Sequence, residues 1–378
     1  VVVGSRANYS SIKSAMSAIK KHKKLELVTI LYASAVIDKF GNVSNLIKKD
    51  GFKIDHEIFM LVEGESNLTM AKSTGLGLIE LSTIFYQTKP DIVVTVGDRF
   101  ETMATAIAAA YMNIPLAHTM GGEVSGTIDE SIRHAITKFS HIHFPASLDA
   151  YQRILKLGEN KDGVYLVGCP RIDLVKSMLG KKPKKLKRIL SEGVGQEIEI
   201  EKPFILISQH PVTTEYDSSE EAILNTLEAV KETGQQAICL WPNSDAGSDL
   251  ISRGIRKFRE THDDLSFRFF KNLPIDVYVY LMSKTLCLVG NSSSGIREGA
   301  FIGTPVVNVG SRQNARERGN NVITVPNVTE EILDAINKQL KHGHYKQNHI
   351  YGDGSAGVKI AEILNKINDV KIQKQITY

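Results

Sequence analysis

Short runs of apolar, β-branched residues alternate along this sequence with longer segments whose apolar positions repeat with helical period. The first pattern predicts buried strands and the second predicts amphipathic helices. The expected strands lie near residues 1–4, 25–32, 91–97, 114–118, 164–168, 203–208, 236–241, 285–290 and 305–309. The expected helices lie between them, for example at 68–88, 101–112, 129–140, 219–232, 274–283 and 330–340. This alternation predicts an α/β protein with parallel sheets covered by helices on both faces.

The alternation restarts near residue 203, after a basic stretch that lacks periodicity. A length of 378 residues suits about two domains. We therefore expect two Rossmann-like, doubly wound domains, the N-terminal one formed by residues 1–170 and the C-terminal one by residues 171–355. The last amphipathic segment, 356–378, is expected to form a helix that crosses back to the N-terminal domain.

The composition is that of an ordinary globular protein, with 42% apolar and 23% charged residues. A net charge of +4 is too small for a dedicated nucleic-acid binder, and the basic run at 181–188 is typical of a solvated helix or linker. No apolar stretch is long enough to span a membrane, and no signal peptide is visible. We therefore expect a cytoplasmic protein that binds neither nucleic acid nor membrane. Cys169, Cys239 and Cys287 lie far apart in or beside apolar runs, which predicts buried, reduced thiols.

Candidate chemistry lies where the expected strands end, because ligands of open parallel sheets bind beyond the carboxyl ends of the strands. Five strands end in glycine or polar residues, at positions 4–6, 97–99, 118–123, 208–211 and 290–295. One such edge would be ordinary, whereas five that carry Arg, Asp, His or a Ser/Gly cluster suggest a crevice between two domains.

The segment 290–295 has two interpretations. Its small residues would let backbone N–H groups and the hydroxyls of Ser292 and Ser293 approach a diphosphate, at the positive end of the helix that follows. The alternative is an ordinary serine helix cap. The sequence has no phosphate-binding loop with lysine, and 75–77 lacks the third glycine of a dinucleotide loop, so nucleotide hydrolysis and nicotinamide chemistry are poorly supported.

Three groups of titratable residues have both a chemical and a structural interpretation. Asp129 and Arg133 lie four residues apart on an expected helix, either as an acid/base group with its arginine or as a surface ion pair. His210 follows a buried strand, where it is either a general acid/base or a hydrogen-bonded loop residue. His141 and His143 alternate on a probable strand without a third ligand, so we expect packed histidines and no metal site.

Several segments carry a resemblance to a known family, and they lie at 97–100, 121–135, 209–214, 242–248, 290–298, 303–308 and 351–354. In this order along the chain they resemble the hydrolysing UDP-N-acetylglucosamine 2-epimerases. The bacterial sialic and legionaminic acid pathway enzymes and the epimerase domain of the animal bifunctional enzyme look most similar. The resemblance covers nearly the whole chain. It implies a fold like that of the GT-B glycosyltransferases, with the sugar nucleotide in the cleft between the domains, and a homodimer or homotetramer.

The resemblance also implies a reaction that uses no cofactor, in the biosynthesis of sialic acid. UDP-N-acetylglucosamine and water would give N-acetylmannosamine and UDP. The C2 proton would leave together with UDP, which produces 2-acetamidoglucal. Water would then add at C1, and C2 would be protonated from the opposite face. This sequence of steps requires acid/base groups on both faces of the sugar.

The matching positions assign roles to individual residues. Asp98, Asp129 and His210 match the catalytic groups of the family, and Arg99 and Arg133 would orient the carboxylates and keep them ionised. The residues expected to contact UDP or substrate are Arg6, Ser10, Arg99, His118, Asn243, Ser292, Ser293, Ser294, Gly295, Glu298 and Arg312. Within this set, Arg6 and Arg312 would neutralise the departing diphosphate, and Glu298 would hold the ribose hydroxyls.

One position departs from the family pattern. Two residues after His118, where relatives often carry a carboxylate, this chain has Met120, which cannot transfer a proton. Either Glu123 or another group takes that role, or the role belongs only to relatives. Since a thioether favours an apolar neighbour over a hydroxyl, UDP-2,4-diacetamido-2,4,6-trideoxyglucose of the legionaminic acid route is an alternative substrate. A non-hydrolysing 2-epimerase, a GT-B glycosyltransferase and a non-catalytic nucleotide-sugar sensor also stay open.

Overall fold

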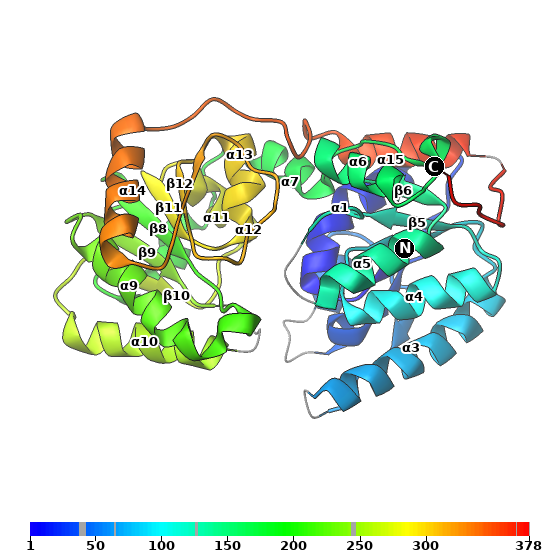
Figure 1. Ribbon diagram of the computed structural model, residues 1–378, viewed down its shortest axis with the longest axis horizontal. Helices are drawn as coiled ribbons and strands as arrows, with labels where there is room; N and C mark the ends of the chain where they lie inside the picture. Colours follow the sequence, from blue (N-terminus) through cyan, green and yellow to red (C-terminus); the bar gives the residue numbers. More distant parts are fainter. Residues whose placement is uncertain (38–42, 64–65, 125–127, 243–246, 368, 378) are drawn as a thin grey trace. The chain divides into compact units, whose positions relative to one another are not determined.

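The chain forms two compact units, which we call unit 1 and unit 2. The computed structural model describes residues 1–37, 43–63, 66–124, 128–242, 247–367 and 369–377. Unit 1 comprises Val1–Leu174 and Tyr351–Tyr378, and unit 2 comprises Val175–Ile350 (Figure 1). The division falls a few residues from the boundaries expected after residues 170 and 355.

Unit 1 contains two three-stranded parallel sheets whose first strands, β1 and β4, lie beside each other. The strands are β1 (Val2–Val3), β2 (Ile30–Tyr32), β3 (His56–Ile58), β4 (Val93–Val96), β5 (Leu116–Thr119) and β6 (Ile142–Phe144). The orders are β1-β2-β3 and β4-β5-β6, so the chain proceeds in opposite directions from the β1/β4 position. Such a switch point is where open α/β sheets bind ligands.

Helices cover both faces of these sheets. They are α1 (Arg6–Lys21), α2 (Val43–Lys49), α3 (Asn67–Thr88), α4 (Phe100–Tyr111), α5 (Ile128–Phe139), α6 (Leu148–Lys156), α7 (Pro170–Met178, which reaches into unit 2) and α15 (Ala356–Lys366), with short 3-10 turns η1 (Ala33–Val36) and η3 (Lys161–Gly163). Val3 and Val94 pack into the core beneath α1 and α15, whereas Val2 and Val93 pack into the core beneath α3 and α4. Neighbouring strand residues therefore supply two separate cores, which is a doubly wound arrangement.

Unit 2 has one seven-stranded sheet of order β13-β12-β11-β8-β9-β10-β7, in which the β10–β7 pair is antiparallel. Its strands are β7 (Val194–Gly195), β8 (Phe204–Ser208), β9 (Gln236–Leu240), β10 (Phe267–Phe270), β11 (Cys287–Gly290), β12 (Val306–Val309) and β13 (Val322–Val325). Its helices are α8 (Leu186–Ser191), η4 (Thr213–Ser218), α9 (Ser219–Lys231), α10 (Ser248–Thr261), α11 (Ile275–Met282), α12 (Ser293–Ile296), α13 (Glu298–Ile302) and α14 (Thr329–His342). The strand order reverses between β8 and β11, which places a second switch point there.

The expected strand at 164–168 is wrong. Only Val164 makes a β-bridge, with His143, and the chain then turns out of the sheet at Gly168, whose φ is +90°. Conversely, the periodicity did not reveal β3, β7, β10 and β13. In β10 the apolar run is interrupted by Arg268, whose guanidinium is buried because it donates to the carbonyls of Leu190 and Ser191.

The cysteines follow expectation. Cys169, Cys239 and Cys287 are buried free thiols, and burial raises the pKa of Cys239 to about 12. Within the described ranges, no helix combines the length and the apolar character that crossing a membrane requires.

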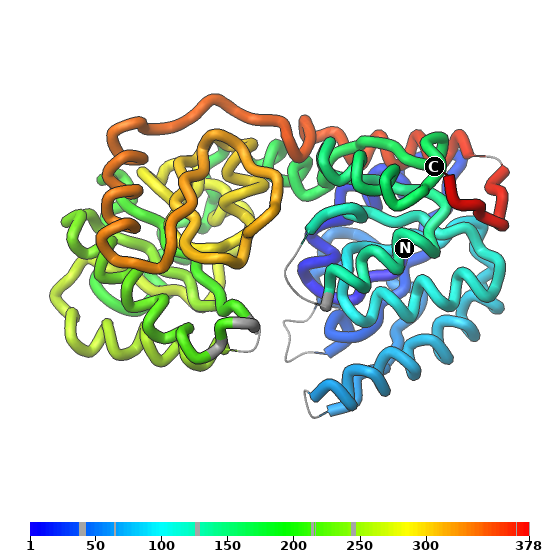
Figure 2. The backbone as a smooth tube through the Cα atoms, in the orientation of Figure 1, coloured from blue at the N-terminus to red at the C-terminus, as the bar shows by residue number. Residues whose placement is uncertain are grey.

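The segment that begins at Tyr351 rejoins unit 1 through closely packed backbone (Figure 2). Cys169 N donates to Tyr351 O at 2.8 Å, and a Cβ on Gly168 would lie 2.7 Å from the Cα of Gly352. Asp173 then caps α15 by accepting from Gly357 N at 2.7 Å and from the preceding amide. These contacts set α15 on α1, where it completes the core of unit 1.

Candidate active site

In unit 1, one guanidinium joins the loops that follow β4 and β5. Arg133, on α5, is 2% exposed; its Nη2 bonds to the carboxylate of Asp98, and its Nη1 donates to Glu123 O at 2.8 Å. Asp98 keeps 29% of its side chain exposed. A carboxylate fixed by a buried arginine and still open to solvent has the placement that a general acid/base needs.

Arg99 contacts a further carboxylate at this edge of unit 1. Its Nε lies 3.1 Å from Oε1 of Glu101, which is almost completely buried and whose pKa is raised by burial. The Arg99 side chain is half exposed. No local pattern in the sequence singles out Glu101, because its burial follows from packing of α4 beneath the β1 and β4 ends.

His118 lies beneath the turn that carries Asp98. It is fully buried on β5, and Nε2 lies 2.7 Å from Gly97 O. Burial lowers the pKa of His118 to about 4, so the ring is neutral near pH 7 and its Nε2–H donates to that carbonyl. His118 therefore holds this turn, and its expected contact with UDP or substrate stays a prediction.

This assignment predicts a pH-dependent stability. Because the folded pKa of His118 lies below the ordinary value of 6.5, the unfolded chain binds the proton better, and the contribution is complete above pH 6.5 and lost as the pH falls toward 4. From pH 7.5 to 5 the loss should be about 2 kcal/mol of unfolding free energy. His118→Gln, which retains a donor for Gly97 O, should remove that part of the slope in urea titrations. Equal slopes in both proteins would contradict the assignment.

The loop after β5 is fixed in a conformation that few residues tolerate. Met120 has a φ of +63° and packs on the core of unit 1, and Gly122 has a φ of +75°. A Cβ on Gly122 would lie 2.3 Å from Ala150 O, so only glycine fits. Glu123, the next residue, is consequently held in a buried position beside the Asp98–Arg133 pair.

The other expected residues of unit 1 lie on helix ends. Ser5 caps α1 by accepting from Asn8 N, and Asn8 Nδ2 donates to Val96 O at 3.3 Å, which links α1 to the end of β4. Arg6 is exposed in the first turn, and Ser10 donates to Arg6 O. Asp129, partly buried, lies in the first turn of α5.

In unit 2, the side chain of Asn291 holds the backbone of His210. Its Oδ1 accepts from His210 N at 2.7 Å and its Nδ2 donates to His210 O at 2.8 Å, which imitates a pair of strand hydrogen bonds. Asn291 O in turn accepts from Gln313 Nε2 at 2.9 Å and from Arg312 Nη1 at 3.3 Å. The structure therefore brings together the loops after β8, β11 and β12. Asn291 lies in the segment 290–298 that resembles the family, but the sequence alone suggests no role for it.

Gly290 explains how closely these loops approach. Its φ is +128°, and a Cβ there would lie 2.3 Å from Ser208 O. Ser292 N donates to the same carbonyl at 3.2 Å. The serine segment thus begins directly beside the end of β8.

The serines divide into an outer and an inner group. Ser292 and Ser293 are partly exposed, whereas Ser294 is buried and shares hydrogen bonds with Ser292 Oγ at 2.9 Å and with Tyr278 OH at 2.6 Å. Gly295 N already donates to Ser292 O. Helix α12 follows this segment as expected but has only four residues, so its dipole is weak and hydroxyl groups have to carry more of any anion binding.

The remaining expected residues are placed as follows. Glu298 is buried at the start of α13, and Arg312 follows β12. Asn243 lies outside the described residues, so its position is not assigned. His143 and His141 are packed, hydrogen-bonded histidines, bonded to Glu159 at 3.2 Å and to Ile372 O at 2.9 Å. No cluster of three or more metal-ligand side chains occurs among the residues that the structure describes.

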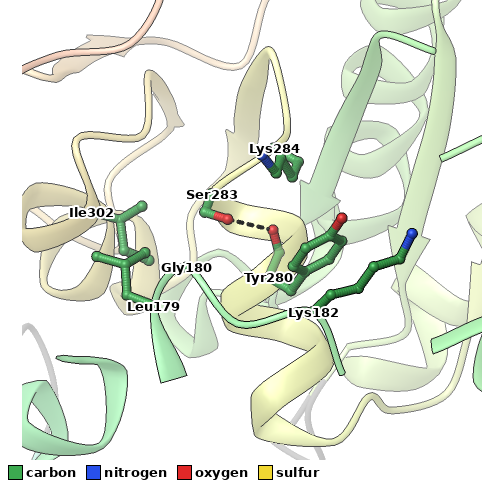
Figure 3. Close-up of a pocket in the computed structure, with 7 residues that line it drawn as sticks. All are labelled: Leu179, Gly180, Lys182, Tyr280, Ser283, Lys284 and Ile302. Carbon is green, nitrogen blue, oxygen red and sulfur yellow. Dashed lines mark hydrogen bonds between the residues drawn. The ribbon is translucent and has the colours of Figure 1, made fainter. Parts of the chain in front are cut away.

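Unit 2 also contains a pocket of about 470 Å³ (Figure 3). It is lined by Leu179, Gly180, Lys182, Tyr280, Ser283, Lys284 and Ile302. None of the described residues expected at the site belongs to it, so this pocket is separate from the candidate chemistry.

The sequence matches the UDP-N-acetylglucosamine 2-epimerase family over residues 17–365. The chain belongs to this family. It is 34% identical to the UDP-N,N'-diacetylbacillosamine 2-epimerase (hydrolyzing) of Legionella pneumophila, over 97% of this chain and 95% of the relative. It is 32% identical to the GDP/UDP-N,N'-diacetylbacillosamine 2-epimerase (hydrolyzing) of Campylobacter jejuni, over 92% and 88% of the two chains.

A solved structure of another protein has the same fold as this chain. The UDP-GlcNAc 2-epimerase of Neisseria meningitidis, solved with UDP-GlcNAc bound, superposes with a TM-score of 0.82 at 20% identity, over 97% of this chain and 98% of that one. The expected GT-B-like fold of two Rossmann-like domains is thereby confirmed. Membership of the 2-epimerase family also favours an epimerase over the glycosyltransferase that the sequence left open.

Proposed function

We propose that this chain is a hydrolysing 2-epimerase that converts a UDP-linked 2-acetamido sugar and water into the free C2 epimer and UDP. The observation that carries the proposal is the pair of fixed groups at the two switch points, Asp98 held by Arg133 in unit 1 and His210 held by Asn291 in unit 2. The two hydrolysing relatives named above support water as the second substrate.

The proposed mechanism assigns roles to groups of each unit in turn. In unit 1, a carboxylate, that of Asp98 or Asp129, exchanges the proton at C2, and Glu123 is a buried carboxylate on the loop that Arg133 joins to Asp98. Departure of UDP requires stabilisation of the diphosphate charge, which Arg312 and the exposed serine hydroxyls supply from unit 2 and Arg6 from unit 1. His210 supplies a second acid/base group, as protonation from the opposite face requires.

Two observations favour the diacetamido sugar over UDP-N-acetylglucosamine. Both hydrolysing relatives act, by their names, on UDP-N,N'-diacetylbacillosamine, which has a 6-methyl group. This chain has Met120, whose thioether suits a methyl neighbour better than a hydroxyl. The alternative, UDP-N-acetylglucosamine, would instead give N-acetylmannosamine for sialic acid synthesis.

A substrate panel in deuterated water tests the proposal. We expect release of UDP, a free 2-epimer and deuterium at C2, with the diacetamido sugar turned over faster than UDP-N-acetylglucosamine. Epimer that is still attached to UDP would contradict hydrolysis. Transfer of the sugar to an acceptor without C2 exchange would identify a glycosyltransferase, and binding of UDP without turnover would identify a sensor.

The exposed serines should contribute to UDP binding. Replacing Ser292 and Ser293 with leucine removes two donors to the diphosphate and should weaken UDP binding by about ten- to a hundredfold in calorimetry. Ser283→Leu is the matched control, because that serine belongs to the separate pocket and bonds only locally, to Tyr280 O. Unchanged affinity in the double variant would refute this part of the site.

A further inference from the structure

The segment after α15, residues 369–377, lies against the end of helix α5 and the turn that contains Glu159. Ile372 O accepts from His141 Nε2 at 2.9 Å, and Thr377 N donates to Gly158 O at 3.0 Å. We call it the C-terminal segment; it is the last, red part of the trace in Figure 2. Helix α5 is the helix that carries Arg133, so this segment contacts an element of the candidate active site at its far end.

Lys374 makes the central contact. Its Nζ lies within hydrogen-bond distance of three carbonyls at the carboxyl end of α5, those of Lys138 at 2.9 Å, Thr137 at 3.4 Å and Ser140, and its three N–H groups are shared among these carbonyls and Glu159. The last carbonyls of a helix have no partner within the helix, and they carry the negative end of its dipole. An ammonium group there satisfies both requirements, so Lys374 caps α5.

The same ammonium neutralises a buried carboxylate. Glu159 is 1% exposed and bonds to Lys374, to Lys138 Nζ at 2.7 Å and to His143 Nε2 at 3.2 Å. Burial raises the pKa of Glu159, but the hydrogen bonds from these three side chains outweigh burial and hold it at about 2. A buried carboxylate that keeps its charge is costly unless it stays paired, which favours a fixed position for Lys374.

The cap and the active-site arginine are connected through one turn of helix. Thr137 O accepts from Lys374, while Thr137 Oγ1 donates to Arg133 O at 3.0 Å. At the other side of this turn, the Arg133 guanidinium spans Asp98 and Glu123 O. A shift of α5 along its axis would therefore move the guanidinium away from Asp98.

We propose that Lys374 is a positioning residue, which holds α5 where Arg133 can fix Asp98. The inference rests on the proposed function for its kinetic effect, but not for its structural effect. Misplacement of a reacting group by about 1 Å is enough to cost about a hundredfold in rate. Lys374 contacts no part of the candidate site itself.

Four variants separate positioning from simple stabilisation. Lys374→Met should lower kcat by about 10- to 100-fold at a temperature where it stays folded, with KM changed less than about twofold. Lys374→Arg, which retains donors and charge, should restore kcat. Lys374→Met combined with Glu159→Gln removes the buried charge, and should recover the melting temperature but not kcat, because the α5 carbonyls remain uncapped. Lys371→Met, at an exposed position of the same segment, is the control.

Hydrogen exchange measured by mass spectrometry provides a readout that does not depend on activity. Lys374→Met should speed exchange in peptides covering residues 128–140, while peptides of β11 and β12 keep their rates. Unchanged exchange in 128–140, or recovery of kcat together with the melting temperature in the double variant, would overturn the inference. Absence of turnover in the unmodified chain would overturn the proposed function instead and leave the exchange result to decide on Lys374.

Discussion

Asp98→Asn is expected to lower kcat by about 10²–10⁴-fold, the range found when a positioned acid/base group is lost. Asparagine has nearly the same shape, and its amide oxygen can still accept from Arg133, so the loop should keep its conformation. The amide cannot take up a proton at neutral pH. The loss should therefore appear in kcat, measured by UDP release and by deuterium uptake at C2.

The control for Asp98→Asn is the same substitution at an exposed aspartate of unit 1. Asp162→Asn changes a side chain on the surface of η3. It should leave kcat within about twofold, since exposed charges contribute little. UDP affinity should be retained in both variants. Turnover near that of the unmodified chain in Asp98→Asn would remove Asp98 from the catalytic groups.

His210→Ala is expected to lower kcat to a comparable extent, about 10²–10⁴-fold, while UDP still binds. The backbone of residue 210 is held by both ends of the Asn291 amide, so removal of the imidazole should leave the loop in place. His342→Ala, which removes an exposed imidazole stacked on Tyr345 in the same unit, should keep full activity. Full activity in His210→Ala would show that protonation on that face uses another group.

Asn291→Ala tests whether the hydrogen bonds that hold the backbone of His210 are needed for turnover, and leaves the imidazole of His210 in place. Loss of both amide contacts should lower kcat less than removal of His210, and the two substitutions combined should cost about as much as His210→Ala alone. Full additivity would indicate that the two residues act independently.

The sequence predicted the elements whose residues pack in a repeating local pattern. β8 is five buried residues in a row, and α5 has a polar and an apolar face, so each is visible from its own composition. β3 was missed because its three residues include a histidine and a glutamate, and because it pairs on one side only within its sheet.

The contacts that form the site join residues that lie far apart in the sequence, so no local sequence pattern reveals them. The spacing of Asp129 and Arg133 suggested an arginine near a carboxylate, but the bond to Asp98 spans 35 positions. The hydrogen bonds between Asn291 and the backbone of His210 join residues 81 positions apart. The bonds from Lys374 to the carbonyls of α5 join residues more than 230 positions apart. Each requires the strand order to be known first, because adjacent strands decide which loops meet.

The return of α15 to unit 1 inverts the order in which the two units can be completed during synthesis. Val175–Ile350 emerges from the ribosome as one continuous stretch, whereas unit 1 has its whole sequence only when the residues after Tyr351 have followed. Until then, the core beside α1 lacks Ile360, Ala361 and Leu364. A released chain truncated after Ile350 should therefore show a protease-resistant unit 2 beside an unfinished unit 1, so the unit whose synthesis starts earlier is the second to mature.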